Sequence, residues 1–328
     1  MTSNGLRSCC HALVAASAAL VLPALSAWPS PPAAAGLGGD VTAAAEISDD
    51  SSALVLASSN NAIRLLIQTN AAASATTLPN TFTLEAHGDT VLQGSGHRAV
   101  TESGSTVIPQ GLTVNGVGPD GSLPDGLPIP GQASGPGWRA IRVNPAPAYH
   151  QRLREYTRDY LVLEPDLVIV HDHVVAVEPS VLRWHLQLPA PTRIDPVWQD
   201  LHLETPRVAL TLSAPGRKGE LRGWTRLDTP AAGKADRTIV VLSPPNEAAT
   251  TLELILVFAV RPAGRRADYA FKLLESDNAV GARIHRDGYP TLVGFQLGQP
   301  VPAPSLSGFK FSGLVGVDVF RPKARPPH

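Results

Sequence analysis

Short apolar runs separated by turn residues recur along most of the chain, and their pattern predicts β-strands. Residues 81–86 (TFTLEA) and 183–188 (RWHLQL) alternate apolar and polar positions with a period of two, as half-buried antiparallel strands do. Turn dipeptides such as Asn115-Gly116 separate such runs. Beyond an apolar N-terminal stretch, no segment keeps helical apolar spacing for three turns. We therefore expect an all-β chain, folded as a large antiparallel β-sandwich without an α/α toroid.

The pattern places one sandwich domain at residues 51–320, followed by a tail at residues 321–328. Within that domain, residues 116–137 hold mostly Gly, Pro, Asp and Ser, and they predict a long flexible loop. The runs that we predict to be strands are 53–57, 63–68, 81–86, 90–93, 112–115, 138–144, 160–164, 167–171, 174–177, 181–188, 201–204, 208–213, 238–243, 251–260, 269–274, 281–285, 291–297 and 309–320.

The N-terminus has the pattern of a secretory signal peptide. Arg7 provides a positive start, residues 12–25 are apolar, and small residues follow near Ala27 and at residues 33–35. The apolar stretch is short for a membrane span and contains Pro23, which favours a cleaved signal over an anchor. We expect a signal peptide at residues 1–35, a linker at residues 36–50, and a secreted or periplasmic protein.

Charge and cysteine content exclude two classes of function. The formal net charge is −1, from 27 basic and 28 acidic side chains, so nothing indicates a nucleic-acid partner. The two cysteines, Cys9 and Cys10, lie inside the predicted signal peptide. The mature body therefore has no disulfide and no thiolate ligand, and its stability has to come from buried apolar surface.

Residues 152–189 (RLREYTRDYLVLEPDLVIVHDHVVAVEPSVLRWHLQLP) resemble the C-terminal β-sandwich of the heparinase II/III-like polysaccharide lyases. That family has an Arg-rich strand, a strand with a Pro-Asp-apolar-Asp pattern, and a strand with an apolar-His pair. Upstream, residues 60–70, 80–96 and 111–118 are similar to its three preceding strands. The resemblance implies degradation of uronic-acid polysaccharides by β-elimination, which needs a base, an acid and an electropositive group that stabilises the enolate.

The chain departs from that family where the family's catalytic and metal-binding groups lie. Nothing before residue 50 has the character of the helical toroid that supplies much of the family's machinery. Residues 74–78 (SATTL) stand where the family has a His-x-His-x-Asp motif, and they contain no histidine or carboxylate. Among the positions of the family's metal ligands, only His185 keeps an imidazole. One imidazole does not hold zinc, which needs three or four protein ligands. We expect no cofactor; the zinc that some family members bind is the alternative.

Three histidines are candidates for chemistry. His185, in an alternating strand between Trp184 and Leu186, is a candidate catalytic residue or a hydrogen-bonded core histidine, whereas Trp184 faces the core. His171 and His173 flank Asp172, and on a continuous strand both imidazoles lie on one face, where they are candidate metal ligands. The alternative is that Asp172 closes a turn between two strands and leaves both histidines facing solvent.

A row of arginines and tyrosines at every second position predicts a binding face. Guanidinium groups bind carboxylates and sulfates in pairs of hydrogen bonds, and tyrosine rings stack on sugars, so the face suits an acidic polysaccharide. The alternative is an ordinary solvated sheet face. The candidate substrate-binding residues are Arg152, Arg154, Tyr156, Arg158 and Tyr160.

These patterns together predict an exported heparinase II/III-like β-sandwich that binds or helps degrade an acidic polysaccharide, without complete lyase machinery of its own. A separate toroid-bearing lyase subunit is a possible partner. Two alternatives remain open: a non-catalytic carbohydrate-binding or cell-envelope structural module, and a truncated remnant with little function.

Overall fold

The computed structural model describes residues 46–47, 53–70, 78–94, 97–101, 104–108, 110–119, 123, 126–189, 192–194, 200–214, 222–227, 237–243, 248–265, 269–286, 289–298 and 303–319. The predicted signal peptide and the C-terminal tail lie outside these residues. Residues 41–328 form one compact unit. The described ranges contain no helix with the length and apolar character needed to cross a membrane.

Strands make up nearly all regular structure in the described ranges, with one short 3-10 helix. The elements are β1 (Glu46–Ile47), β2 (Ala53–Ala57), β3 (Ile63–Gln68), β4 (Phe82–Ala86), β5 (Asp89–Leu92), β6 (His97–Thr101), β7 (Gly104–Ile108), β8 (Gly111–Val114), β9 (Gly131–Gly135), β10 (Trp138–Val143), η1 (Ala146–Tyr149), β11 (Leu153–Leu163), β12 (Leu167–Ser180), β13 (Leu182–Pro189), β14 (Thr192–Ile194), β15 (Leu201–Glu204), β16 (Val208–Ser213), β17 (Arg222–Leu227), β18 (Arg237–Ser243), β19 (Ala249–Pro262), β20 (Tyr269–Glu275), β21 (Ala279–Arg286), β22 (Tyr289–Gln296), β23 (Ser305–Leu306), β24 (Phe309–Lys310) and β25 (Val315–Val319).

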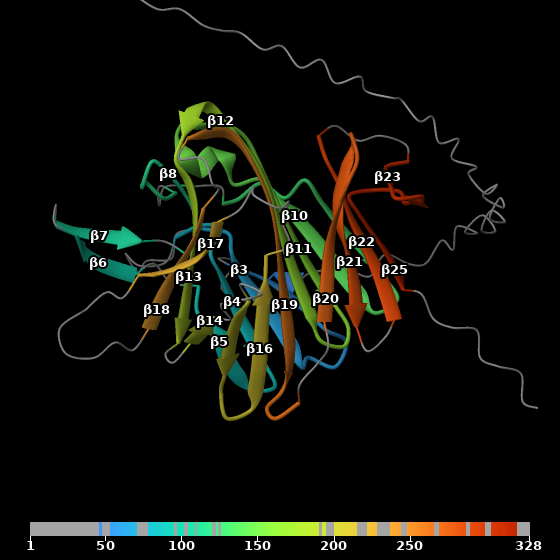
Figure 1. Ribbon diagram of the computed structural model, residues 1–328. Coiled ribbons are helices and arrows are strands. Elements are labelled where there is room, and N and C mark those ends of the chain that lie inside the picture. Colours follow the sequence, from blue (N-terminus) through green and yellow to red (C-terminus); the bar gives the residue numbers. More distant parts are fainter. Residues whose placement is uncertain are drawn as a thin grey trace, which may run out of the picture. The chain divides into compact units, whose positions relative to one another are not determined.

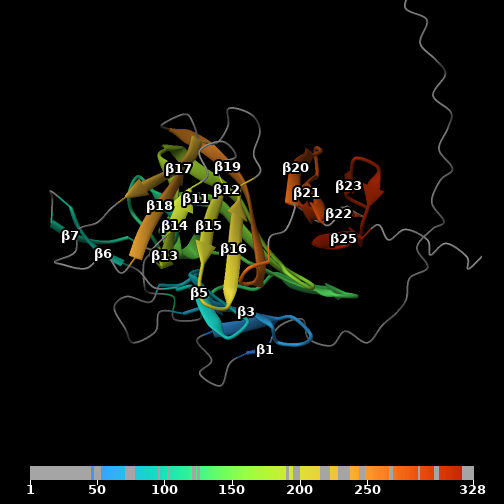
Figure 2. The same cartoon turned by 60° about the horizontal axis from the view of Figure 1, so that its bottom comes forward.

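The strands form antiparallel sheets around a central one of eight strands, in the order β14-β15-β16-β19-β12-β11-β10-β9. A five-stranded sheet runs β1 to β5, and two four-stranded sheets have the orders β17-β18-β13-β8 and β20-β21-β22-β25. Figure 1 shows the C-terminal sheet, in orange and red, as a group of its own beside the long strands β11 and β19, and Figure 2 shows the same separation. The prediction of an all-β sandwich is confirmed.

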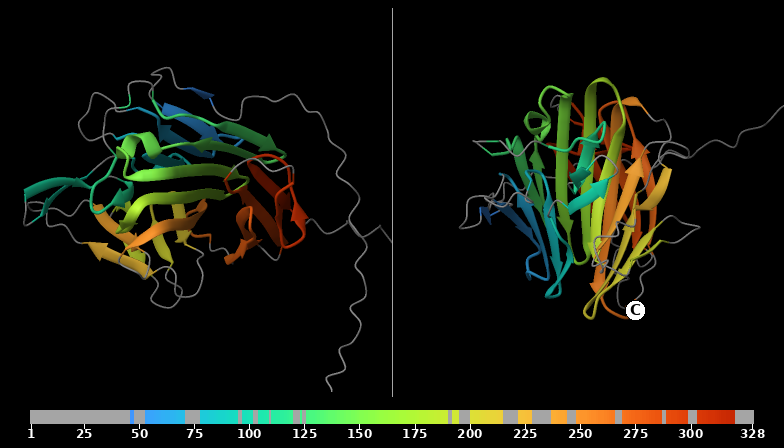
Figure 3. Two further views of the ribbon diagram at one scale, coloured as in Figure 1. Left: turned by 90° about the horizontal axis from the view of Figure 1, so that it is seen from above. Right: turned by 90° about the vertical axis from the view of Figure 1, so that its left-hand side faces the viewer.

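The central sheet buries both of its faces. Along β12 and β19, alternate side chains such as Val170 and Leu254 join a core shared with the five-stranded sheet and with β8 and β13. The intervening side chains, such as Ile169 and Val257, join a second core with β21, β22 and β25. Burial on both faces explains why residues 254–260 (LILVFAV) are apolar without alternation. Figure 3 shows the green strands between the blue five-stranded sheet and the orange-red C-terminal strands.

Three predictions about individual elements are wrong. Asp172 does not close a turn, because β12 continues unbroken from Leu167 to Ser180 and pairs with β11 and β19 on either side of that residue. The predicted loop at residues 116–137 contains β9, which adds to the edge of the central sheet beside β10. Part of the predicted linker, Glu46–Ile47, is β1 and pairs with β2.

Candidate functional site

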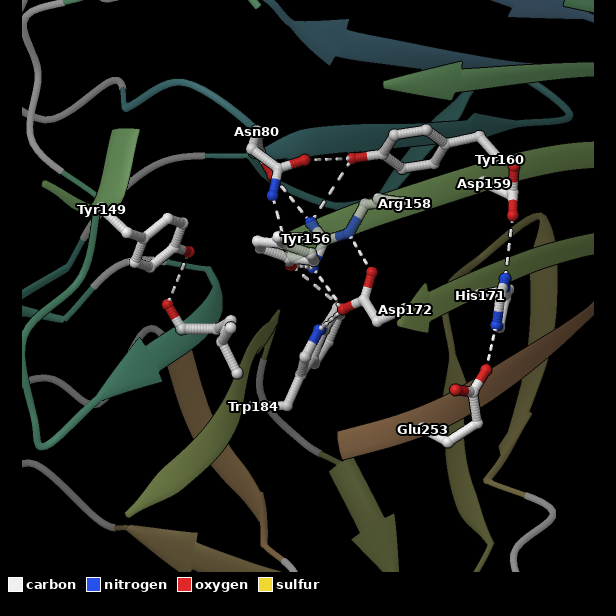
Figure 4. Close-up of polar contacts among 11 residues, drawn as sticks. Asn80, Tyr149, Tyr156, Arg158, Asp159, Tyr160, His171, Asp172, Trp184 and Glu253 are labelled. Atoms are coloured by element: carbon white, nitrogen blue, oxygen red, sulfur yellow. Dashed lines mark hydrogen bonds and ion pairs between the residues drawn. The ribbon is translucent and has the colours of Figure 1, made fainter. Parts of the chain in front are cut away.

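Strands β11, β12 and β13 carry a buried cluster of polar and aromatic side chains around Arg158 (Figure 4). Arg158 is 0% exposed and Asp172, opposite it on β12, is 1% exposed. The guanidinium donates to the carboxylate through Nε (2.5 Å) and a terminal nitrogen (2.6 Å). Trp184 Nε1 donates to the same carboxylate at 2.7 Å, and Tyr156 donates its hydroxyl to it at 3.1 Å. Each oxygen of Asp172 is therefore satisfied inside the protein.

Aromatic rings enclose the guanidinium. Its central carbon lies 5.5 Å from the ring centre of Tyr156, 5.8 Å from that of Tyr160 and 5.4 Å from that of Trp184. Burial opposes the positive charge, but the Asp172 carboxylate outweighs it and raises the pKa of Arg158 well above its usual range. A buried ion pair thus ties β11 to β12 in the core, while the Asn80 carbonyl accepts a further hydrogen bond from Arg158 at 2.8 Å.

This geometry corrects the predicted binding face. Tyr156, Arg158 and Tyr160 do lie on one face of β11, but that face is in the core, and none of the three is more than 1% exposed. The expectation that they face a polysaccharide at the surface is wrong. Burial also raises the pKa of Tyr160 to about 12, so its hydroxyl stays protonated.

A register shift separates the two remaining arginines from that buried face. The pairing of β11 with β12 skips one residue between Leu153 and Glu155, which leaves Arg154 as the extra residue of a β-bulge. Arg154 is exposed, whereas Arg152 is half-buried and donates to the carbonyl oxygens of Tyr149 (2.8 Å) and Gly118 (3.1 Å). Of the five predicted residues, Arg154 is therefore the one fully presented to solvent.

The opposite face of the same strands carries a chain of charges. Asp159 receives two hydrogen bonds from Arg142, at 2.7 and 2.8 Å, and its Oδ2 lies 2.8 Å from His171 Nδ1. The other ring nitrogen of His171 contacts Glu253, whose second oxygen lies 2.7 Å from His173 Nδ1. His171 is wholly buried and stacks on Phe295 of the C-terminal sheet, with 4.7 Å between ring centres. This row of charged and polar side chains runs from Arg142 in the core to the half-buried imidazole of His173.

The charged neighbours of His171 determine its protonation state. Burial alone lowers the pKa of His171, but the carboxylates of Glu253 and Asp159 outweigh it and raise that pKa to about 9. Burial likewise opposes the charge of Glu253, but the neighbouring His171 outweighs it and lowers the pKa of Glu253 to about 2. His171 is therefore an imidazolium at neutral pH, a state in which it does not ligate a metal. In the described part of the chain, no group of three or more His, Cys, Asp or Glu residues is arranged to hold a metal ion.

His185 lies on the outer face of β13, 7% exposed, with Trp184 in the core as predicted. Its Nε2 lies 2.9 Å from Thr113 Oγ1, and that hydroxyl is 3.4 Å from the carbonyl of Arg183, to which it donates. Thr113 therefore accepts from Nε2–H, which leaves Nδ1 as the bare nitrogen, and Nδ1 has no hydrogen-bond partner. Burial, helped by the charge of Arg183, lowers the pKa of His185 to about 4.

The residues that correspond to the family's zinc ligands do not fit a zinc ion. His185 is a neutral imidazole with a hydroxyl as its partner, and the buried Gln110 has an amide nitrogen with no partner. Zinc requires three or four nitrogen, sulfur or carboxylate ligands, and these two side chains offer one. Of residues 74–78, which replace the family's His-x-His-x-Asp motif, residues 74–77 lie outside the described residues.

The sequence reading missed the partners of these clusters. Arg142, Asp159 and Glu253 are charged residues with apolar neighbours in their strands, and a charged residue in the core needs a buried partner. That signal was readable, but the identity of each partner was not, because the partners lie up to 82 residues away in the chain.

Comparison with known proteins identifies the architecture. No family model matches the sequence, and no curated protein matches it. Among solved structures, the heparan sulfate lyase HepC from Pedobacter heparinus superimposes with a TM-score of 0.59 at 13% identity, covering 78% of this chain and 43% of the lyase. Heparinase III superimposes with a TM-score of 0.55 at 12% identity, covering 75% of this chain and 41% of that one.

The fold is that of the heparinase β-sandwich. The heparinase-like resemblance read from residues 152–189 is thereby confirmed for the fold. At this level of identity the likeness carries no residue roles, and the matched region spans less than half the length of either lyase. Activity, substrate and partners therefore need arguments of their own.

Proposed function

We propose that this chain is an exported β-sandwich protein that binds an acidic, uronic-acid polysaccharide and helps to degrade it beside a separate toroid-bearing subunit. The observation that carries the proposal is the fold: three quarters of this chain superimposes on polysaccharide lyases of which it covers well under half. The export signal read from residues 1–35 suits such a role in the periplasm or outside the cell.

Burial of the proton-transfer groups favours binding over independent catalysis. β-Elimination needs a base and an acid within hydrogen-bond reach of the sugar. Tyr149, Tyr156 and Tyr160 are all at most 1% exposed, and burial raises the pKa of each. His185 is buried as well, and its lowered pKa makes the imidazole a poor base at neutral pH. These groups do not meet a substrate at the surface of the described structure.

The exposed Arg154 in the β-bulge and the half-buried Arg152 before it are the proposed binding residues. Arg154 presents its guanidinium to solvent, and Arg152 lies next to it with part of its side chain accessible. A guanidinium binds a carboxylate or sulfate through two parallel hydrogen bonds. An acidic glycan that crosses the N-terminal end of β11 would meet both.

The first experiment separates binding from degradation. The purified protein is incubated with heparin, alginate and hyaluronan, and absorbance of unsaturated uronates is followed while affinity for each polymer is measured by calorimetry. We expect measurable affinity for at least one polymer and no product from the protein alone. Product from the protein alone would contradict the assignment, and affinity without product in the presence of a toroid-bearing subunit would identify a non-catalytic carbohydrate-binding module.

A matched pair of variants tests the binding residue. Arg154→Ala should weaken affinity about tenfold or more, because a charged hydrogen bond contributes about 1.5–3 kcal/mol when it is made. Arg265→Ala, at another exposed arginine in the turn after β19, is the control and should leave affinity unchanged. Equal losses in both variants would indicate nonspecific charge attraction. No affinity for any of the three polymers would favour a structural role in the cell envelope.

A further inference from the structure

A small polar pocket opens on the five-stranded sheet, where the turn before β3 meets the hairpin turn between β4 and β5. Its volume is about 250 Å³. The pocket is distinct from the arginines near the β-bulge, because none of its lining residues belongs to β11 or β12. Its lining residues are Asn61, Ala62, Arg64, Glu85, Ala86, His87, Gly88, Asp89 and Thr90.

The two turns hold the pocket open in one conformation. His87 and Gly88 form a two-residue hairpin loop between Ala86 and Asp89, with φ angles of 49° and 85°. The backbone N–H of His87 donates to the carbonyl of Ala62 at 2.8 Å, which fixes one turn against the other. Asparagine or aspartate satisfies the first position of such a turn equally well, so the turn itself does not require an imidazole there.

The charged groups that line the pocket neutralise one another. Arg64 and Glu85 form an ion pair at 2.8 Å across β3 and β4. Asp89 accepts from the hydroxyl of Thr205 at 2.7 Å and lies 3.7 Å from a guanidinium nitrogen of Arg207. With each cation matched to a carboxylate, the pocket offers no uncompensated charge to an anion.

Three other lining side chains remain uncommitted. Within the described residues, the amide of Asn61, the imidazole of His87 and the hydroxyl of Thr90 make no hydrogen bond to other side chains or to the backbone. Together they supply donors and acceptors in a pocket that Ala62 and Ala86 also line. Vicinal hydroxyl groups on a ring with apolar C–H faces match that combination, since each hydroxyl both donates and accepts.

We propose that this pocket binds a neutral sugar ring through its hydroxyl groups, with His87, Asn61 and Thr90 as the recognition residues. The site is independent of the acidic-polysaccharide face, because its chemistry selects hydroxyls rather than carboxylates.

The test uses two probes with the same ring, glucose and glucuronate, titrated into the isotope-labelled full-length protein and followed by NMR. Glucose should shift the amides of residues 61–64 and 85–90 with a dissociation constant on the order of 1 mM, as suits a small open pocket. Glucuronate should bind no more tightly, because Glu85 and Asp89 line the site.

Matched variants locate the contact. His87→Asn keeps the turn geometry but replaces the imidazole with a shorter amide, and it should weaken glucose binding about fivefold. Thr90→Val removes a hydroxyl that can donate and accept, and it should do the same. His285→Asn and Thr251→Val, at exposed positions on β21 and β19, are the controls and should have no effect. Shifts outside the pocket, tighter binding of glucuronate than of glucose, or equal losses in the controls would overturn the proposal. None of these results depends on whether Arg154 binds an acidic polymer.

Discussion

His171 and His185 are both buried in the sandwich, yet their pKa values move in opposite directions. His171 lies between two carboxylates on neighbouring strands, and its pKa rises to about 9. His185 has only a hydroxyl partner and a nearby arginine, and its pKa falls to about 4. Burial opposes the charged form in both cases, so the partners decide the outcome. The comparison shows which polar groups of this fold carry charge and which stay neutral.

The largest expected effect is a loss of unfolding free energy when the buried ion pair between Arg158 and Asp172 is broken. Arg158→Met would leave the carboxylate of Asp172 in the core without its cation, and breaking one partner of a buried pair costs about 3–5 kcal/mol. Urea unfolding followed by fluorescence of the buried Trp184 measures the loss. The double variant Arg158→Met/Asp172→Asn should recover part of it. A single-variant loss below about 1 kcal/mol would mean that the pair contributes no more than a surface salt bridge.

The second test follows unfolding free energy from pH 4 to pH 9. Above pH 6.5 the unfolded chain loses a proton that folded His171 keeps up to about pH 9, so its contribution is complete below pH 6.5 and lost as the pH rises through 9. Below pH 6.5 the unfolded chain binds a proton on His185, whereas folded His185 stays neutral down to about pH 4. Its contribution to the unfolding free energy is therefore complete above pH 6.5 and lost as the pH falls through 4.

The alkaline limb of this pH profile, from His171, and the acid limb, from His185, each correspond to a change in unfolding free energy on the order of 3 kcal/mol. The variants assign the limbs: His171→Gln should flatten the alkaline limb, and His185→Gln should flatten the acid limb. The measured quantity is the difference between each variant and the parent protein at every pH, because carboxylates elsewhere also titrate. Identical pH profiles for both variants would refute the assignment of opposite shifts.

The smallest effect concerns the one hydrogen bond of His185. Thr113→Val removes the acceptor of Nε2–H and leaves both ring nitrogens without partners, which should cost about 1–2 kcal/mol in thermal or urea unfolding. Thr251→Val, an exposed position on β19, controls for the β-propensity of valine. If both substitutions have the same effect, the Thr113 contact does not stabilise the neutral imidazole.

Most of the fold was readable from alternation and turn residues, since cores of this kind repeat a local pattern. The failures have physical causes. The His-Asp-His sequence at residues 171–173 resembles a turn because polar residues are typical of turns. Its polar groups are instead matched across strands, by Arg158 and Glu253, rather than along the chain. Strand β9 has no apolar pattern, because it lies at a sheet edge where its side chains are partly exposed.

The prediction of a binding face on β11 was wrong for a different reason. Period two is a correct reading of β11, but alternation does not say which face is inside, and here the tyrosines and Arg158 face the core. A single bulge residue then moved Arg154 out of phase with them. The polar pocket beside β4 and β5 also escaped the sequence, because it depends on two turns that approach each other in space.

Because the eight-stranded sheet is apolar on both sides, the C-terminal sheet of β20, β21, β22 and β25 acts as its cover. A recombinant fragment ending near residue 265 would expose Ile169, Ile255 and Val257 to water as a continuous apolar patch. Such a fragment should aggregate, whereas one that keeps residues 269–319 should stay in solution. Boundaries for expression, crystallisation or domain grafting are therefore set by this last sheet rather than by the central strands.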